Sequence, residues 1–248
     1  MNEATMSANP TEPRSAATLL IVRDQPFEVL MVRRHSGGTF HSALVFPGGA
    51  VDPQDSAAHW PGNTRGGHSL SAEDRAFRIA AARETWEEAG LLVGVDGAPD
   101  NPDPSIPYPE LVGATHTGLD LDQLHDFAHW VTPATEKRRF DTRFFLARAP
   151  HGQQARFDGR ETVSMQWTSP SRALQLHESG EVPLLFPTRL NLERLAESDT
   201  VDSAISAAQS RPRYVVEPVI EIRAGAITVR IPADAGYSQT SDFRGPSD

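Results

Sequence analysis

The chain has 248 residues, 38% of them hydrophobic and 23% charged, which is the composition of a globular rather than a disordered protein. A formal net charge of −10 argues against general binding to nucleic acid or to an anionic membrane surface. The absence of cysteine excludes disulfides, a zinc ribbon and catalysis by a thiolate. No apolar run approaches the roughly 20 residues of a membrane span. We therefore expect a cytoplasmic protein with no nucleic-acid or membrane partner.

Residues 1–16 are polar and lack the apolar core of a signal peptide, so a disordered tail is expected there. Thr18–Arg23 and Glu28–Arg33 are rich in Leu, Ile, Val and Met and are separated by a proline turn, which predicts two strands. Ala43–Phe46 has the pattern of a third, short strand. Pro53–Gly67 is rich in glycine and proline, has no apolar periodicity and is expected to be a loop.

Ser71–Ala89 has the features of a helix. Ser71 is a suitable N-cap, with Asp74 three residues further on as in a capping box. Several alanines favour the helical interior, and Gly90 suits the left-handed residue that commonly ends a helix.

Beyond this helix, Ala98–Pro109 is rich in proline and aspartate and is expected to be an exposed loop. Further strands are predicted at Phe127–Val131, Arg139–Ala147 and Thr162–Trp167, and further helices at Pro170–Glu178 and Thr188–Glu197. Residues 212–237 hold two apolar segments around a glycine turn and predict a β-hairpin extension, followed by a disordered tail over 238–248. The alternation of strands and helices places residues 17–211 in one mixed α/β domain.

The segment from Arg83 to Leu91, Arg-Glu-Thr-Trp-Glu-Glu-Ala-Gly-Leu, carries the most information about chemistry. On a helix, Glu84 and Glu88 lie one turn apart on the same face, with Glu87 beside them. Three carboxylates in one turn repel one another unless a cation collects them, and hard oxygen ligands favour Mg²⁺ or Mn²⁺. Arg83 is placed to hold one of these carboxylates. The alternative is a solvated acidic helix face.

A glycine turn lies upstream of this helix, in Phe46-Pro47-Gly48-Gly49. Two glycines let the backbone turn sharply at the end of a strand and expose a carbonyl group. A loop followed by an acidic helix is the arrangement that a metal-assisted phosphate site requires. On its own, the Gly48-Gly49 pair would indicate only an ordinary turn.

Together these residues resemble the Nudix box, the signature of hydrolases that act on a nucleoside diphosphate linked to another group. Arg83–Leu91 matches the second half of the box, and Gly49 matches its first glycine. Asp55 stands where the box has a glutamate, and residues 56–82 stand where the box has a short spacer.

The split box, with Trp130-Val131-Thr132-Pro133 and Arg138–Phe145, is similar to the branch that includes nucleoside diphosphate-linked moiety X motif 19. That branch is associated with CoA and acyl-CoA diphosphatase activity. The resemblance implies an α/β/α sandwich around a mixed sheet and a small-molecule nucleotide substrate. It also implies divalent-cation-dependent hydrolysis of a diphosphate bond, in CoA or an acyl-CoA. The alternatives are a diphosphatase for ADP-ribose, NADH or nucleotide sugars, and a nucleotide-binding regulatory module without turnover.

The resemblance also assigns roles by position. It implies that Glu84, Glu87 and Glu88, with the carbonyl group of Gly49, hold Mg²⁺ or Mn²⁺. It implies that Arg83 takes part in catalysis by orienting Glu84, which serves both catalysis and the metal. The family commonly uses a base from a later loop.

Three candidates lie beyond the box. Glu161, at the start of a predicted strand, is the candidate base, and a solvated acid at a strand edge is the alternative. Arg139 and Arg143 share a strand face and are candidates for binding substrate phosphates, because a guanidinium suits bidentate contact with an oxyanion. Asp141 lies between them, so a structural ion-pair ladder is the alternative.

Residues 56–70 within the box hold no carboxylate, so they are not expected to supply acidic metal ligands. They are expected to form a flap that shapes substrate choice, with Trp60 stacking on the nucleotide. The alternative is a solvent loop with Trp60 packed on the core. The terminal hairpin is expected to dock on the core or on a second subunit, and the latter would make a homodimer.

Overall fold

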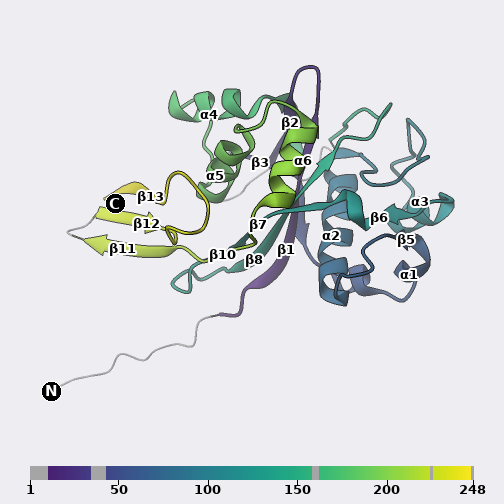
Figure 1. Cartoon of the computed structure of the whole chain (residues 1–248), viewed down its shortest axis with the longest axis horizontal. Coiled ribbons are helices and arrows are strands. Elements are labelled where there is room, and N and C mark those ends of the chain that lie inside the picture. Colours follow the sequence, from purple (N-terminus) through teal and green to yellow (C-terminus); the bar gives the residue numbers. More distant parts are fainter. Residues whose placement is uncertain (1–10, 35–42, 158–161, 224–225, 247–248) are drawn as a thin grey trace.

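The computed structural model of the chain describes residues 11–34, 43–157, 162–223 and 226–246. A central mixed sheet lies between two layers of helices, and a small three-stranded sheet extends from one side (Figure 1). This arrangement confirms the expected α/β/α sandwich. In the part of the chain that is described, no helix combines the length and apolar character that crossing a bilayer would require.

The central sheet is mixed because two of its strand pairs are parallel. β1 (Arg14–Arg23) runs parallel to β8 (Phe140–Arg148), and β10 runs parallel to β7, whereas the other pairs are antiparallel. The strand order is β10-β7-β8-β1-β2-β3, with β4 paired to β1 and β9 paired to β2. The remaining strands are β2 (Glu28–Arg34), β3 (Leu44–Val45), β4 (Gly48–Ala50), β7 (His125–Val131), β9 (Thr162–Thr168) and β10 (Val215–Val216).

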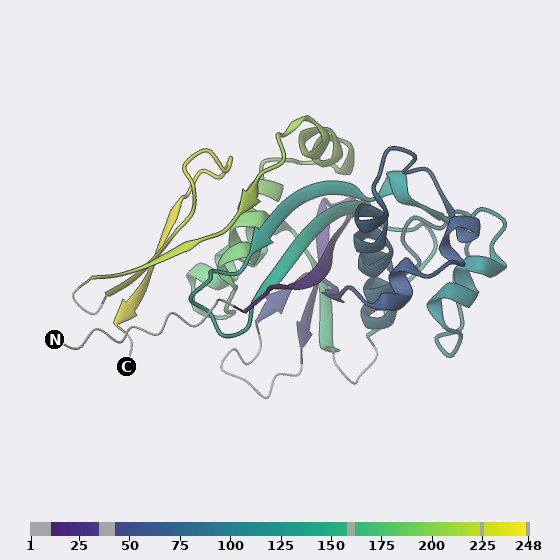
Figure 2. The ribbon, with the colours of Figure 1, turned by 90° about the horizontal axis from the view of Figure 1, so that it is seen from below.

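Alternate residues of the central strands point to opposite faces, so the sheet has a core on each side. Leu20 of β1 packs in the core beneath one helical layer and Leu19 in the core beneath the other. Figure 2 shows these layers on opposite sides of the sheet. The first layer holds α4 (Pro170–Glu178), α5 (Phe186–Leu195) and α6 (Val201–Ser210), and the second holds α1 (Trp60–Asn63), α2 (Ala72–Ala89) and α3 (Tyr108–Ala114).

α2 begins and ends where the sequence predicted. The Ser71 hydroxyl accepts a hydrogen bond from the Asp74 N–H at 3.0 Å, and Gly90 ends the helix with a left-handed φ of 66°. The consecutive alanines at 80–82 are fully buried, which lets the helix lie close to the sheet. This close packing brings the last turns of α2 against β4.

Residues Pro53–Gly67 fold into short elements, which corrects the expectation of a loop there. They contain the 3₁₀ turn η1 (Pro53–Ser56), α1 and β5 (Thr64–Arg65). β5 pairs in parallel with β6 (Leu119–Asp120), just before the 3₁₀ turn η2 (Leu121–Gln123). No local periodicity marks these elements, because their partners lie far downstream in the sequence.

Trp60 is only 3% exposed, and its indole N–H donates to the Gln54 carbonyl at 2.8 Å. Its ring lies 5.8 Å from that of Tyr108, which is also buried and begins α3 inside the range expected to be an exposed loop. The expectation that Trp60 stacks on a nucleotide from a flap is therefore wrong for this structure. The alternative, in which Trp60 packs on the core, agrees with it.

The terminal extension is larger than the predicted hairpin. β11 (Val219–Arg223) and β12 (Ala226–Arg230) pair antiparallel as expected, and β13 (Ser241–Pro246) adds a third strand. β13 corrects the expectation of a disordered tail over 238–248, since its polar sequence becomes a strand only by pairing with β12. Similarly, β1 starts at Arg14, inside the segment expected to be a tail, whereas residues 1–10 lie outside the described part.

Tyr237 connects this extension to the main core. Its hydroxyl accepts a hydrogen bond from the Trp130 indole N–H at 3.0 Å and donates one to the Asn191 side-chain oxygen at 2.7 Å. Ile231 and Ala235 are buried in the same core beside it. The extension is therefore docked on its own chain, one of the two arrangements expected from the sequence.

Candidate active site

The two glutamates one turn apart on α2 lie directly on the glycines of β4. Glu88 is 3% exposed and accepts a hydrogen bond from the Gly48 N–H at 3.0 Å. Glu84 lies against Gly49, where an added Cβ would come within 2.3 Å of its Oε2 atom. Only glycine allows so close an approach of the helix carboxylate to the strand. The structure thus brings Gly49, Glu84 and Glu88 together.

Arg83 is the buried centre of the carboxylate network. Its Nη1 atom contacts Glu84 at 2.9 Å and Glu87 at 3.0 Å, and its side chain is only 3% exposed. Nη2 also donates to the Ala50 carbonyl at 3.0 Å, which joins α2 to β4. The geometry agrees with the expectation that Arg83 orients Glu84.

Asp55 is the residue whose role the sequence left open. It is 1% exposed, and its two oxygens accept hydrogen bonds from Nε and Nη2 of Arg83 at 2.8 and 3.0 Å. It also accepts a hydrogen bond from the Asp52 N–H at 2.8 Å. Asp55 therefore fixes the orientation of Arg83 from outside the helix. The only signal in the sequence was its position, where the box has a glutamate.

Two carboxyl groups of this cluster, those of Glu84 and Glu87, have a raised pKa. Burial raises the pKa of Glu84 to about 7, with the repulsion of Glu87 and Glu88 adding to the rise and Arg83 opposing it. Burial likewise raises the pKa of Glu87. Burial tends to lower the pKa of Arg83, but its carboxylate partners, Asp55 foremost, raise it overall, so the guanidinium stays charged. The cluster thus carries more carboxylate than one arginine neutralises.

This excess of carboxylate oxygen fits a hard divalent cation. Glu84 and Glu88 offer oxygens beside the glycine turn, where a cation would relieve their repulsion. Glu87 is different, because its side chain is half exposed and bound to Arg83. Within the described ranges, no three acidic or imidazole side chains form a ready-made metal site. The donor chemistry of Glu84 and Glu88 therefore fits a hard divalent cation, and the ligand roles of Glu84, Glu87, Glu88 and the Gly49 carbonyl stay predictions.

Arg139, a predicted substrate-binding residue, has structural partners instead. Its guanidinium donates to the carbonyls of Thr132 and Thr11 at 3.0 Å each and to Glu217 at 2.8 Å. Thr11 belongs to the N-terminal segment and Glu217 to the terminal extension, so no local pattern predicts these two partners. With its donors committed and the residue 8% exposed, Arg139 does not face a substrate site. The alternative ladder with Asp141 does not form either, because Asp141 pairs with His129.

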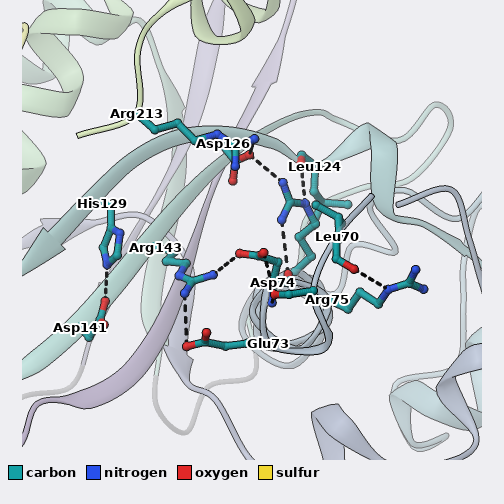
Figure 3. Close-up of polar contacts among 12 residues, drawn as sticks. Leu70, Glu73, Asp74, Arg75, Leu124, Asp126, His129, Asp141, Arg143 and Arg213 are labelled. Carbon is teal, nitrogen blue, oxygen red and sulfur yellow. Dashed lines mark hydrogen bonds and ion pairs between the residues drawn. The ribbon is translucent and has the colours of Figure 1, made fainter. Parts of the chain in front are cut away.

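Two predicted site residues remain, the candidate base Glu161 and the candidate phosphate-binding residue Arg143. Glu161 lies outside the described residues, so its role as a base stays a prediction. Arg143 faces α2, where it pairs with Asp74 and, at 3.3 Å, with Glu73 (Figure 3). Arg143 also lines a cavity of about 630 Å³ at the N-terminal half of α2. Sequence reasoning missed this cavity because its walls come from distant segments.

The chain is similar to proteins of one family along most of its length. A family model described as the NUDT19 Nudix domain matches residues 110–195. The acyl-coenzyme A diphosphatase NUDT19 of Gallus gallus is 28% identical over 94% of this chain and 82% of its own length. The protein of that name from Homo sapiens is 29% identical over 88% of this chain and 74% of its own length.

A solved structure extends this similarity to the fold. The crystal structure of a Nudix hydrolase from Alicyclobacillus acidocaldarius is 32% identical and superposes with a TM-score of 0.65. The match covers 82% of this chain and 99% of that one. In both sequence and architecture, the chain therefore belongs to the Nudix hydrolase family.

Proposed function

We propose that this Nudix pyrophosphohydrolase cleaves the diphosphate bond of CoA or an acyl-CoA with the help of Mg²⁺ or Mn²⁺. Water adds to one phosphorus, and the bond from that phosphorus to the bridging oxygen breaks. The products are 4′-phosphopantetheine, or its acyl form, and adenosine 3′,5′-bisphosphate. The choice of CoA is supported by the two relatives named acyl-coenzyme A diphosphatase.

The proposal of hydrolysis is supported by one observation. Glu88 and Glu84 contact the two glycines of β4, Gly48 and Gly49. These two carboxylates would hold the cation, Arg83 keeps Glu84 oriented, and Asp55 keeps Arg83 oriented. A bound divalent cation supplies neutralisation of the diphosphate charge and lowers the pKa of an attacking water. Gly49 contributes by its lack of a side chain, which leaves the carboxylate of Glu84 room beside the strand.

A panel of diphosphates tests the proposal. CoA, an acyl-CoA, ADP-ribose, NADH and a nucleotide sugar are each incubated with Mg²⁺, with Mn²⁺ or with excess chelator. We expect turnover only with a cation, the highest kcat/KM for CoA or acyl-CoA, and two phosphate monoesters as products. A preference for ADP-ribose, NADH or the nucleotide sugar would contradict the choice of substrate. Nucleotide binding without turnover would favour the regulatory module, and full turnover in chelator would refute cation dependence.

Cation binding is expected to release a proton at about pH 6, because the carboxyl group of Glu84, with its pKa of about 7, must lose that proton to become a ligand. At about pH 8.5 this group is already ionised and releases none. Calorimetric titration of Mn²⁺ in two buffers of different ionisation enthalpy measures the number of protons released. Equal proton release at both pH values would contradict the assignment of Glu84 as a ligand.

The raised pKa of Glu84 also determines how the stability of the cation-free protein depends on pH. The folded-state pKa of Glu84, about 7, lies above its ordinary value of 4.5, so folding favours the protonated form. Its stabilising contribution is fully present below about pH 4.5 and is lost as the pH rises through about 7. Added cation should oppose this loss, because it binds the ionised form of the folded protein.

A further inference from the structure

We propose that the cavity beside the N-terminal half of α2 binds a phosphate monoester on the ribose of the substrate, an inference that rests on the proposed function. The cavity is enclosed by α2, by the start of β7 and by the connection from α6 to β10. Its volume of about 630 Å³ lies in the range of small-molecule sites. None of the box glutamates lines it, so it is a subsite separate from the hydrolytic centre.

The charge of the cavity is opposite to that of the chain. Five arginines and three aspartates line it, whereas the whole chain has a formal net charge of −10. Guanidinium groups are well suited to phosphate because their donors match its oxygens bidentately. A cationic cavity in an acidic protein therefore selects an anionic group. The arginines are Arg78, Arg143, Arg194, Arg211 and Arg213.

Two of these guanidinium groups have unused donors. The Nε atoms of Arg143 and Arg194 are buried and have no hydrogen-bond partner among the described residues. The Nη atoms of Arg194 donate to backbone carbonyls, at 3.0 Å to Ala235 and 2.9 Å to Gly236, rather than to a carboxylate. The Arg194 guanidinium also stacks on the Tyr237 ring at 3.5 Å, but no carboxylate among the described residues hydrogen-bonds to it, so an anion in the cavity would compensate its charge.

Arg213 adds a positively charged side chain that can turn toward a bound ligand. Its side chain is 71% exposed and pairs with the carboxylate of Asp126 (Figure 3), which the buried Arg78 also binds. Because Arg78 alone already binds that carboxylate at 2.8 Å, Arg213 can turn toward a phosphate without leaving Asp126 unpaired. Arg143 and Arg211 have carboxylate partners of their own, so Arg194 and Arg213 supply the positive charge that is left for an anion.

The sheet register places this cavity within reach of the hydrolytic centre. Arg143 on β8 lies opposite Ala17 on β1, and Ala17 lies opposite Gly49 on β4. Two steps of about 4.8 Å put the Arg143 backbone about 10 Å from that of Gly49, on the same face of the sheet. A nucleotide whose diphosphate lies at Glu84 can therefore extend along the sheet toward Arg143.

The chemistry of the cavity selects one end of the substrate. The acyl-pantetheine arm beyond the diphosphate is uncharged and would leave the guanidinium of Arg194, which binds no carboxylate among the described residues, without a counter-charge. The nucleoside end of CoA carries a 3′-phosphate, and Leu70, Leu121 and Leu124 in the cavity wall offer apolar contact to the attached nucleoside. We therefore assign the cavity to the ribose 3′-phosphate.

Equilibrium binding to the full chain in chelator tests this assignment. Adenosine 3′,5′-bisphosphate should bind at least tenfold more tightly than AMP, because each charge-assisted contact to the second phosphate adds roughly tenfold or more. Arg143→Met and Arg213→Gln should each reduce this preference several-fold while changing the affinity for AMP little. The matched control is Arg148→Gln, which removes an exposed ion pair with Asp202 outside the cavity and should keep the preference.

Arg143→Met leaves Asp74 without its partner, so thermal unfolding of each variant is measured alongside. Arg213 is exposed enough for its variant to stay folded, and this keeps the test decisive. Equal affinity of the native chain for the two nucleotides would overturn the assignment, as would an unchanged preference in Arg213→Gln and a folded Arg143→Met.

Kinetics with CoA and 3′-dephospho-CoA separate this inference from the proposed function. A higher kcat/KM for CoA that Arg213→Gln abolishes supports the subsite. If both compounds are hydrolysed equally well, the subsite is refuted while the diphosphatase activity stands. If neither is hydrolysed, the proposed function fails, and the preference for the bisphosphate nucleotide alone decides whether the cavity binds a ribose phosphate.

Discussion

Replacing Glu88 by Gln is expected to lower kcat by roughly three powers of ten, with a much smaller change in KM. Glutamine keeps the shape of the side chain and an oxygen that can accept the Gly48 N–H hydrogen bond, which is 3.0 Å long in the native chain. It removes the negative charge from the position where a cation would be held. The loss should therefore fall on the reaction rate and spare the fold. Steady-state kinetics with CoA and Mg²⁺ measure it.

The matched control is Glu110→Gln, which neutralises an exposed glutamate on α3, in the same helical layer but outside the glutamate cluster. This variant should keep the native kcat. Thermal unfolding of both variants shows whether either change affects the fold. A Glu88→Gln variant with a native rate and native cation dependence would place the hydrolytic centre elsewhere.

The Arg83→Met substitution is expected to lower the free energy of unfolding by about 3–5 kcal/mol, because it leaves a buried carboxylate without its partner. Asp55 is 1% exposed and would lose both of its hydrogen bonds to the guanidinium. The bond from Arg83 to the Ala50 carbonyl would also be lost, which loosens β4 from α2. Urea unfolding followed by circular dichroism measures the change.

A double-mutant cycle locates the cause of this loss. Asp55→Leu removes the stranded carboxylate, so Arg83→Met combined with Asp55→Leu should be more stable than Arg83→Met alone. Additive losses would show that the Arg83–Asp55 pair is not the source. Arg83→Lys should restore only part of the stability, because one ammonium group cannot reproduce the fork that binds Asp55, Glu84 and Glu87.

The sequence predicted the elements whose signals are local. The cap at Ser71 and the terminal glycine at Gly90 bounded α2, and the strand predicted at Arg139–Ala147 corresponds to β8. Helical spacing also predicted that Glu84 and Glu88 lie on one face of α2. These features depend on residues within a few positions of one another.

The features that the sequence did not predict depend on contacts between distant segments. Trp60 packs on Tyr108 and Arg139 binds Glu217, so neither partner could be found from spacing. The same holds for β13, which needs β12 to become a strand. α6 was missed because two of the three residues of its buried stripe, Val201, Ala204 and Ala208, are alanines, which give only a weak apolar pattern.

The pairing of β5 with β6 has a consequence for the folding of the hydrolytic helix. β5 precedes α2 in the chain and β6 follows it. Their pairing therefore closes a loop of the chain that contains the helix. Gly67 strengthens the closure by donating its N–H to Asp122 at 2.9 Å and accepting a hydrogen bond from Arg75 at 2.9 Å. A helix whose first turn is held in this way cannot unravel from its N-terminal end without breaking these contacts. Its amide hydrogens should therefore exchange with solvent only in openings that approach unfolding of the whole domain.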